Sequence, residues 1–405
     1  MKVVILSNTD SGGGAAIACR RLNDALNKNG VYSKMLVIDK KTTSSDVEKV
    51  KEGPFRKMFT YLEYLFQRKI LLKDKSVAMF SMNKVGEDIS DNLLLRSADV
   101  INIHWINFGF LSLIDIEKIY ALGKPVVWTL HDMWLFTGGC HYSGDCLKYE
   151  KDCDVCPMLN FGTVSHSIWK KKKEIFAGRK INVITPSQWL GDLCKTASLT
   201  QSANVQSIVN TLDTELFKPI AKEDACKKLG LDPSKKYLLF SAANPNDVRK
   251  GFAYFVEAIA LVKQQYKGDV ELIVMGKEQK AFENLPLKLN YVGFVKSEEA
   301  AATVYNAASV FVIPSLEDNL PNTIVEALSC GTPSVGFAIG GIKEMIATGV
   351  NGYLAQPKNA ADLAKGIVQV LENPDFEGAR RSALERYSNA VVAQKHIEFF
   401  KSIMK

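Results

Sequence analysis

The chain has 405 residues, of which 47% are hydrophobic and 23% are charged. That length is too great for one ordinary domain, and the composition is that of a soluble globular protein with an ample core. Because no run of about 18 apolar residues occurs, a transmembrane helix is excluded. The formal net charge of +7 lies wholly in residues 1–205, which hold 28 Lys and Arg against 21 Asp and Glu. Such an excess is typical of a half that meets an anionic partner, such as a membrane surface or nucleic acid, or it simply serves solubility.

The N-terminus begins with a single charge, then a short apolar run and then polar residues. That pattern reads as a first strand rather than as a signal peptide. We therefore expect a cytoplasmic chain whose eight cysteines are reduced.

The first half alternates strand and helix patterns. Val3–Ser7 reads as a buried strand, and Ala15–Asn27 places apolar residues on one side of a helix that Gly30 closes. With a strand at Val31–Asp39, these elements form a βαβ unit with a Gly-rich first turn. Further strands are expected at Val100–Ile103, Val126–Leu130 and Val183–Thr185.

The Gly-rich turn allows two interpretations. The segment from Gly12 to Ile17 matches the first two glycines of the GxGxxG dinucleotide motif, and Asp39 ends the second strand, where an NAD-binding protein keeps its ribose-binding acid. However, Ile17 replaces the third glycine and would crowd the approach of the helix to a pyrophosphate. We therefore favour a tight phosphate-binding turn that serves another substrate, with Gly13 and Gly14 at its centre.

Residues 54–73 break the alternation with an aromatic and basic helix. Large apolar side chains are interspersed there with Arg56, Lys57, Arg68, Lys69 and Lys73. Together with the basic cluster at residues 168–173, this helix would form an interfacial membrane-docking surface. The alternative is an ordinary amphipathic helix whose apolar face packs in the core. The charge excess of this half favours docking.

Residues 128–158 are rich in cysteine and histidine. Cys140, Cys146, Cys153 and Cys156 have the spacing C-x5-C-x6-C-x2-C. The last pair is a standard zinc half-site, whereas the first pair is irregular. A structural zinc, free or redox-active thiols, and two disulfides in an oxidising compartment all fit this pattern. A catalytic zinc fits less well, because four thiolates close the coordination shell.

His131 and Asp132 follow the strand Val126–Leu130. They therefore lie at the edge where open parallel sheets bind ligands. A lone histidine is more often structural than catalytic, and it is this position that makes His131 a candidate site residue.

The second half shows the same alternation of strand and helix patterns. Its expected strands are Tyr237–Ala242, Val270–Met275, Leu289–Val292, Val310–Ile313, Thr332–Phe337 and Gly352–Leu354. Its expected helices are Gly251–Gln265, Glu298–Ala307, Ala360–Leu371 and a last one of about Ala379–Met404. Two α/β halves therefore follow one another, each with its own ligand-binding edge.

The stretch Pro314–Pro333 carries the strongest candidate site. A loop with Asp318 follows a buried strand, and a helix begins near Thr323, so that anionic groups are favoured at its N-terminus. Asp318 and Glu326 flank this point. Thr323 and Glu326 also have the spacing of a capping box, so the alternative is that Glu326 caps its own helix.

Two cations, Arg249 and Lys250, precede a helix in the same half. An isolated Arg–Lys pair usually faces solvent. Cations and a helix N-terminus opposite two carboxylates nevertheless suit a diphosphate that carries sugar hydroxyls. The second half is therefore predicted to bind such a group.

Taken together, these residues resemble the retaining glycosyltransferases of family four. That family has the GT-B fold, an α/β architecture of two Rossmann-like domains facing each other across a cleft. The resemblance spans nearly the whole chain and is carried by the Gly-rich turn, His131-Asp132, Thr185-Pro186-Ser187, Val209–Asp213, Phe217-Lys218-Pro219, Lys250-Gly251, Gly276, Tyr291–Phe294 and Pro314–Pro333. The last block looks like the family's E-x7-E motif, with Asp318 in place of the first Glu. A family Arg is replaced by Pro245, for which Arg249 would substitute.

The resemblance implies a role for each matching residue. His131 would lie beside the donor sugar, Lys250 would neutralise the leaving diphosphate, and Asp318 would hold sugar hydroxyls. Arg249 would assist Lys250, and Glu326 would bind the ribose hydroxyls. The other donor-binding residues would be Gly13, Gly14, Gly276, Phe294, Val295, Asn319, Leu320, Asn322 and Thr323, of which Phe294 and Val295 would line the base pocket.

The resemblance also implies a domain plan and an activity. Residues 1–205 would form the acceptor-side domain, with a C-terminal helix 383–405 packing back on it, and residues 206–382 the nucleotide-sugar domain. A retaining, metal-independent hexosyltransferase would pass a sugar from a UDP- or GDP-sugar to a glycan or lipid-linked glycan in bacterial surface polysaccharide synthesis, at the inner membrane face. No catalytic cofactor and no nucleic acid would take part. The alternatives are a nucleotide-sugar epimerase, a non-catalytic nucleotide-sugar-binding protein and, more weakly, an oxidoreductase.

Overall fold

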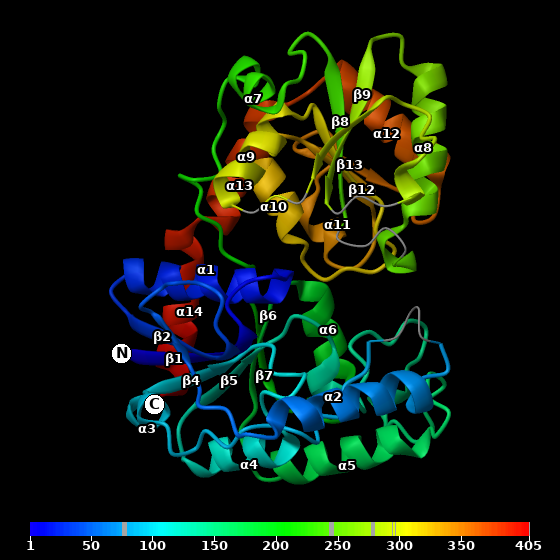
Figure 1. Cartoon of the computed structure of the whole chain (residues 1–405). Coiled ribbons are helices and arrows are strands. Elements are labelled where there is room, and N and C mark those ends of the chain that lie inside the picture. Colours follow the sequence, from blue (N-terminus) through cyan, green and yellow to red (C-terminus); the bar gives the residue numbers. More distant parts are fainter. Residues whose placement is uncertain (75–78, 243–246, 277–279, 294, 296, 405) are drawn as a thin grey trace. The chain divides into compact units, whose positions relative to one another are not determined.

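The computed structural model describes residues 1–74, 79–242, 247–276, 280–293, 295 and 297–404. The chain divides into two compact units: the first comprises Met1–Thr211 with Val392–Lys405, and the second comprises Leu212–Val391. Each unit is built on one parallel β-sheet (Figure 1). The boundaries expected from the sequence, after residues 205 and 382, fall six and nine residues before these.

The first sheet has seven strands in the order β3-β2-β1-β4-β5-β6-β7. They are β1 (Lys2–Thr9), β2 (Tyr32–Asp39), β3 (Val47–Lys49), β4 (Val100–Ile103), β5 (Val126–Thr129), β6 (Asn182–Thr185) and β7 (Asn204–Ser207). Successive residues of β1 enter different cores: Val4 and Leu6 lie in one hydrophobic cluster, and Val3 and Ile5 lie in the other. Both faces of the sheet are therefore covered, which explains why its central strands are apolar throughout.

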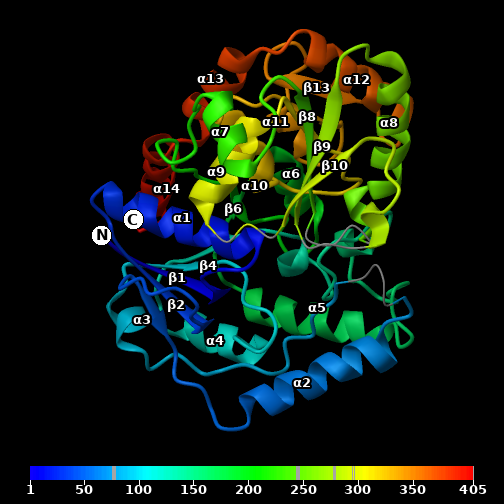
Figure 2. The same cartoon turned by 45° about the horizontal axis from the view of Figure 1, so that its top comes forward.

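Helices cover these two faces. α1 (Gly14–Lys28) and α14 (Asn389–Ile403) pack with the cluster of Val3 and Ile5. The opposite cluster receives residues from α3 (Leu93–Ser97), α4 (Leu113–Ala121), α5 (Thr163–Phe176) and α6 (Gln188–Thr196). On that side α2 (Arg56–Phe66) lies at the periphery of the unit (Figure 2).

The second sheet has six strands in the order β10-β9-β8-β11-β12-β13. They are β8 (Lys236–Ala242), β9 (Val270–Gly276), β10 (Leu289–Gly293), β11 (Val310–Ile313), β12 (Ser334–Phe337) and β13 (Gly352–Ala355). The helices of this unit are α7 (Lys222–Leu229), α8 (Phe252–Gln265), α9 (Glu298–Ala307), α10 (Asn322–Ser329), α11 (Ile342–Met345), α12 (Ala360–Glu372) and α13 (Phe376–Tyr387). In both sheets the strand order reverses beside the first strand, which is where doubly wound folds bind ligands.

The structure corrects three expectations about the elements. The single final helix is two helices, because the chain is extended at Ser388 and Tyr387 accepts a backbone hydrogen bond from Leu212. The helix expected over residues 54–73 is α-helical only to Phe66 and continues as a π-helical turn, Gln67–Leu71. The short edge strands β3 and β7 were not expected. Short 3-10 turns occur at Trp134–Phe136, Lys148–Glu150, Val248–Lys250 and Lys280–Phe282.

Candidate active site

In the second unit, the loops that follow the adjacent strands β8 and β11 are held against each other. The backbone N–H of Leu316 donates to the carbonyl oxygen of Arg249 at 2.7 Å. Gly251 has φ +64°, and a Cβ there would lie 1.9 Å from the carbonyl oxygen of Pro314. Only glycine therefore allows this approach, which brings the cationic loop to the carboxyl end of β11.

This approach joins two of the predicted catalytic residues directly. Lys250 Nζ donates to Asp318 Oδ2 at 2.7 Å, and the two side chains are 37% and 14% exposed. A cation and a carboxylate thus sit together at the ligand-binding edge of the sheet. Sequence reasoning placed both residues at this edge but did not foresee that they pair.

A second glycine turn, which sequence reasoning missed, supports Asp318. Gly340 follows β12, has φ +47°, and would place a Cβ 2.1 Å from the carbonyl oxygen of Asp318. The next residue, Gly341, donates its N–H to that same oxygen at 3.2 Å. Consecutive glycines shortly after a strand were the available signal, because they mark a turn with a close backbone approach.

Glu326 is not a helix cap. α10 begins at Asn322 with Pro321 as its N-cap residue, and no side chain caps it. The carboxylate of Glu326 lies inside the unit and accepts a hydrogen bond from the hydroxyl of Tyr305 at 2.8 Å. The capping-box alternative is therefore wrong, because the helix starts before Thr323 and Glu326 is already on its inner side.

The other donor-binding predictions for this unit lie around the same edge. Arg249 donates from Nε and Nη2 to the two carboxylate oxygens of Asp247, at 3.1 and 2.7 Å. Asn319 and Leu320 are buried in the loop before α10, whereas Asn322 and Thr323 open that helix. Gly276 ends β9 and Val295 is half-buried, whereas Phe294 lies outside the described residues. The roles assigned to these residues stay predictions.

In the first unit, the Gly-rich turn follows β1 and leads into α1. Gly12 has φ +93°, Gly13 is the extended N-cap residue, and Gly14 is the first residue of α1. A Cβ on Gly13 would meet no atom within 4 Å. The turn therefore presents the N-terminus of a 15-residue helix, where backbone N–H groups favour an anion.

His131 is half-buried and lies at the end of a chain of buried polar groups. Thr129 donates to Asn102 Oδ1 at 2.9 Å, which identifies the other amide atom of Asn102 as the nitrogen. That nitrogen can only donate, and it donates to His104 Nε2 at 3.0 Å. His104 then carries its proton on Nδ1, which lies 3.0 Å from His131 Nε2. His131 Nε2 is thus an acceptor and its proton lies on Nδ1.

The surroundings of His131 also keep it neutral. Burial lowers its pKa to about 4, although the nearby Asp132 acts in the opposite direction. At neutral pH the ring is therefore a hydrogen-bond donor rather than a cation. His104, at the end of β4, was missed by sequence reasoning; its position after an apolar strand, like that of His131, was the signal.

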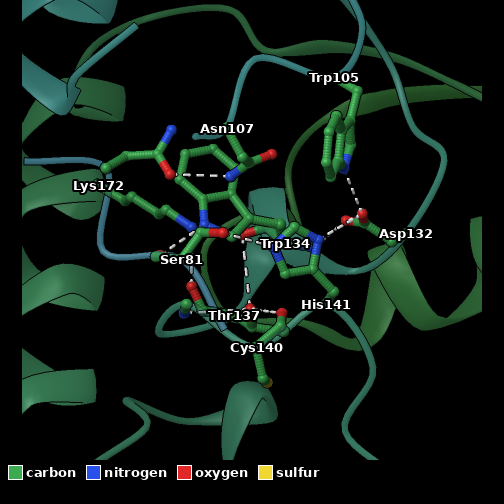
Figure 3. A network of polar contacts seen from close by, with 11 residues as sticks. Ser81, Trp105, Asn107, Asp132, Trp134, Thr137, Cys140, His141 and Lys172 are labelled. Atoms are coloured by element: carbon green, nitrogen blue, oxygen red, sulfur yellow. Dashed lines mark hydrogen bonds and ion pairs between the residues drawn. The ribbon is translucent and has the colours of Figure 1, made fainter. Parts of the chain in front are cut away.

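Asp132 is the centre of a neighbouring network (Figure 3). Its Oδ2 accepts hydrogen bonds from Trp105 Nε1 at 3.0 Å and from His141 Nδ1 at 2.6 Å. Its Oδ1 accepts from the backbone N–H of Trp134 at 2.8 Å. Burial alone would raise the pKa of Asp132. His141 and these other hydrogen bonds lower it by more, so the net shift of the pKa is downward. The network fixes the loop that carries His131.

Lys172 closes this network from α5. Its side chain is buried, and Nζ lies 3.6 Å from the centre of the Trp134 ring. The ammonium donates to the carbonyl oxygens of Trp134 and of Thr137, the latter at 3.0 Å. Burial lowers the pKa of Lys172 to about 7. The segment between β5 and α5 is therefore held by polar contacts rather than by regular secondary structure.

The four cysteines Cys140, Cys146, Cys153 and Cys156 line one small cavity in that segment. All four are free thiols, and Cys153 Sγ accepts a hydrogen bond from the backbone N–H of Gly138 at 3.2 Å. Within the described residues, no three or more His, Cys, Asp or Glu side chains are grouped so that they could hold a metal ion. The predicted structural zinc stays a prediction.

The similarity to known proteins agrees with this arrangement. Residues 235–373, which lie in the second unit, match the family described as Glycosyl transferases group 1. An uncharacterised glycosyltransferase of Methanocaldococcus jannaschii is 26% identical over 44% of this chain and 48% of its own length. The chain thus spans about half the length of this relative. A putative colanic acid biosynthesis glycosyl transferase of Escherichia coli K12 is 22% identical over 75% of each chain.

Solved structures show the same fold over the whole chain. The Anabaena protein HepE in complex with UDP-glucose superposes with a TM-score of 0.66 at 16% identity, covering 99% of this chain and all of that one. The predicted fold class, two Rossmann-like α/β units as in GT-B glycosyltransferases, is therefore confirmed, as is the predicted resemblance to glycosyltransferases. Among the described residues, no helix is long and apolar enough to cross a membrane.

Proposed function

We propose that the protein is a retaining glycosyltransferase that transfers a sugar from a nucleotide-sugar donor to a glycan or lipid-linked glycan acceptor. The observation that carries this proposal is the Lys250–Asp318 pair at the carboxyl ends of β8 and β11. It lies in the unit that contains the residues matching the Glycosyl transferases group 1 family. The structural neighbour in complex with UDP-glucose supports a nucleotide-sugar donor, and the similarity to the colanic acid glycosyl transferase supports a role in bacterial surface polysaccharide synthesis, at the inner membrane face.

The pair has the chemistry that the reaction needs. When a nucleoside diphosphate leaves a sugar, negative charge develops on the diphosphate and positive character on the sugar ring. Lys250 would stabilise the diphosphate charge together with the N-terminus of α10, so no metal ion is required for that purpose. Asp318 would hold donor-sugar hydroxyls, and Glu326, already a hydrogen-bond acceptor, would hold the ribose.

His131 would act as a neutral donor. With its proton on Nδ1 and a pKa of about 4, it can donate a hydrogen bond to a sugar hydroxyl without bringing a positive charge to the bond that breaks. The acceptor hydroxyl would attack on the same face as the leaving group, with retention of configuration.

A panel of nucleotides and nucleotide sugars tests the proposal. Binding to the folded state raises the unfolding free energy by about 2.7 kcal/mol at a ligand concentration of 100 times Kd. We expect one nucleoside diphosphate and its sugars to raise the melting temperature of the wild type, and the matching sugar to be transferred to an acceptor. The variant Lys250→Ala should lose transfer, whereas Lys227→Ala, which changes an exposed lysine on α7, should keep it. Indifference of the wild type to every nucleoside diphosphate would refute the proposal.

A further inference from the structure

Helix α2 faces the protein with its polar side, and the π-helical turn that follows it buries Gln67 and Leu71. Arg56, Thr60, Glu63 and Gln67 recur every three or four positions and so share one side of the helix. Gln67 is buried and the other three are half-buried. None of the residues of α2 itself is fully buried. The core-facing side of this helix is therefore not its apolar side.

Specific polar contacts hold that side in place. The carboxylate of Glu63 accepts hydrogen bonds from the backbone N–H groups of Lys84 and Val85, at 3.2 and 3.1 Å. Arg56 donates to the Glu52 carboxylate at 2.6 Å and to the carbonyl oxygen of Gly109 at 3.3 Å. These contacts fix the rotation of the helix about its axis, so the outward direction of its other side is built in.

The side turned to solvent is a continuous apolar surface, here termed the outer ridge. It consists of Phe55, Met58, Phe59, Leu62, Phe66 and Ile70, which are between 39% and 62% exposed. Their spacing is that of one face of a helix. Single exposed apolar residues are ordinary, but a row of six is typical of an interaction surface. The alternative interpretation, in which the apolar face of this helix packs in the core, is thus wrong.

Positive charge accompanies the outer ridge. Lys57, Arg68, Lys69 and Lys73 are exposed along the same segment. From residue 53 to residue 73 the sequence contains one acidic residue, Glu63, and that carboxylate is turned to the protein. A partner of this surface therefore meets apolar side chains and cations together.

We propose that the outer ridge docks on the surface of a lipid bilayer that contains anionic lipids. Aromatic and aliphatic side chains would enter the boundary between headgroups and acyl chains, while the lysines and Arg68 would contact lipid phosphates. The position of α2 at the periphery of its unit leaves this side uncovered within the unit (Figures 1 and 2). The proposal is independent of sugar transfer, although it would bring a lipid-linked acceptor and the protein to the same surface.

Vesicle flotation of the full chain tests the proposal. The wild type is expected to float with vesicles of phosphatidylcholine and phosphatidylglycerol. It should float much less in high salt, and much less with vesicles of phosphatidylcholine alone. The triple variant Phe59→Ser, Leu62→Ser, Phe66→Ser should bind at least about tenfold more weakly, because it removes three apolar anchors. The double variant Leu93→Ser, Ile114→Ser replaces side chains that are 81% and 58% exposed on α3 and α4 and should bind like the wild type.

A charge variant and two further measurements complete the test. Arg68→Ala with Lys69→Ala should weaken binding to anionic vesicles by roughly tenfold or more. The melting temperature of the triple variant, measured without any ligand, should lie close to that of the wild type, which shows that the variant is folded. Equal flotation of the triple variant and the wild type would overturn the proposal. A dimer of the wild type that the triple variant abolishes, without vesicle binding, would overturn it as well and assign the ridge to a second copy of the chain.

Discussion

Replacing Lys250 by alanine separates catalysis from stability. The ion pair with Asp318 spans 2.7 Å, but the lysine side chain is 37% exposed and the carboxylate 14%, so water and salt screen it. Such a pair contributes at most about 1 kcal/mol to the unfolding free energy. The same ammonium, acting on a diphosphate that gains charge in the transition state, would contribute about 3–4 kcal/mol, or a factor of about 10²–10³ in rate.

The assay therefore reads two quantities on the same protein. Release of the nucleoside diphosphate gives kcat and KM, and denaturant melts give the unfolding free energy. We expect Lys250→Ala to lose at least about 10²-fold in kcat/KM while losing no more than about 1 kcal/mol in stability. If activity per folded molecule stayed within about threefold of the wild type, or if only stability fell, the pair would be structural and the reasoning would be refuted.

Three further predictions concern the pH response, a glycine turn and the cysteines. The pKa of His131 is about 4 in the folded state and about 6.5 when unfolded, so between these pH values the unfolded chain binds more protons and the unfolding free energy falls as the pH is lowered. His131→Gln should show a shallower fall. Equal slopes of the unfolding free energy against pH, measured by denaturant melts, would contradict the burial argument. Gly340→Ala should cost about 1–3 kcal/mol more than Gly123→Ala, because both have positive φ but only Gly340 lies against Asp318; equal losses in melting experiments would show that the contact relaxes. If the four cysteines that line one cavity move together to bind zinc, protein purified without a chelator should carry about one equivalent that Cys153→Ser loses; less than about half an equivalent in the wild type would count against the site.

The sequence predicted the central strands of the two sheets because these strands are buried on both faces. Such strands are short apolar runs between turn residues, and this pattern does not depend on distant contacts. The same logic selected the candidate site residues, since ligand residues follow the strands at their carboxyl ends. Asp318 and His131 lie after β11 and β5 as expected, and their roles stay predictions. Local sequence patterns therefore predict the strands correctly where these patterns agree with the fold.

What the sequence did not predict depends on contacts between distant segments. The pairing of Lys250 with Asp318 requires the approach of Gly251 to Pro314, which no local pattern encodes. The capping-box spacing was real, but Tyr305 draws Glu326 into the unit instead. For α2 the periodicity showed that its two faces differ without showing which one faces the core. Polar contacts with loops far along the chain decided that.

The Lys250–Asp318 pair also predicts how donor binding and catalysis divide. A carboxylate that is only 14% exposed would be costly to bury alone, and the pair offsets that cost before a donor arrives. On binding, a diphosphate would take the place of the Asp318 carboxylate beside Lys250, so that the ammonium exchanges one anionic partner for another. The gain in ground-state affinity would therefore be small. The gain would increase when the bond to the sugar breaks and the diphosphate acquires charge. Lys250→Ala should therefore lower kcat more than it raises KM, and a rise in KM with kcat unchanged would assign Lys250 to substrate binding alone.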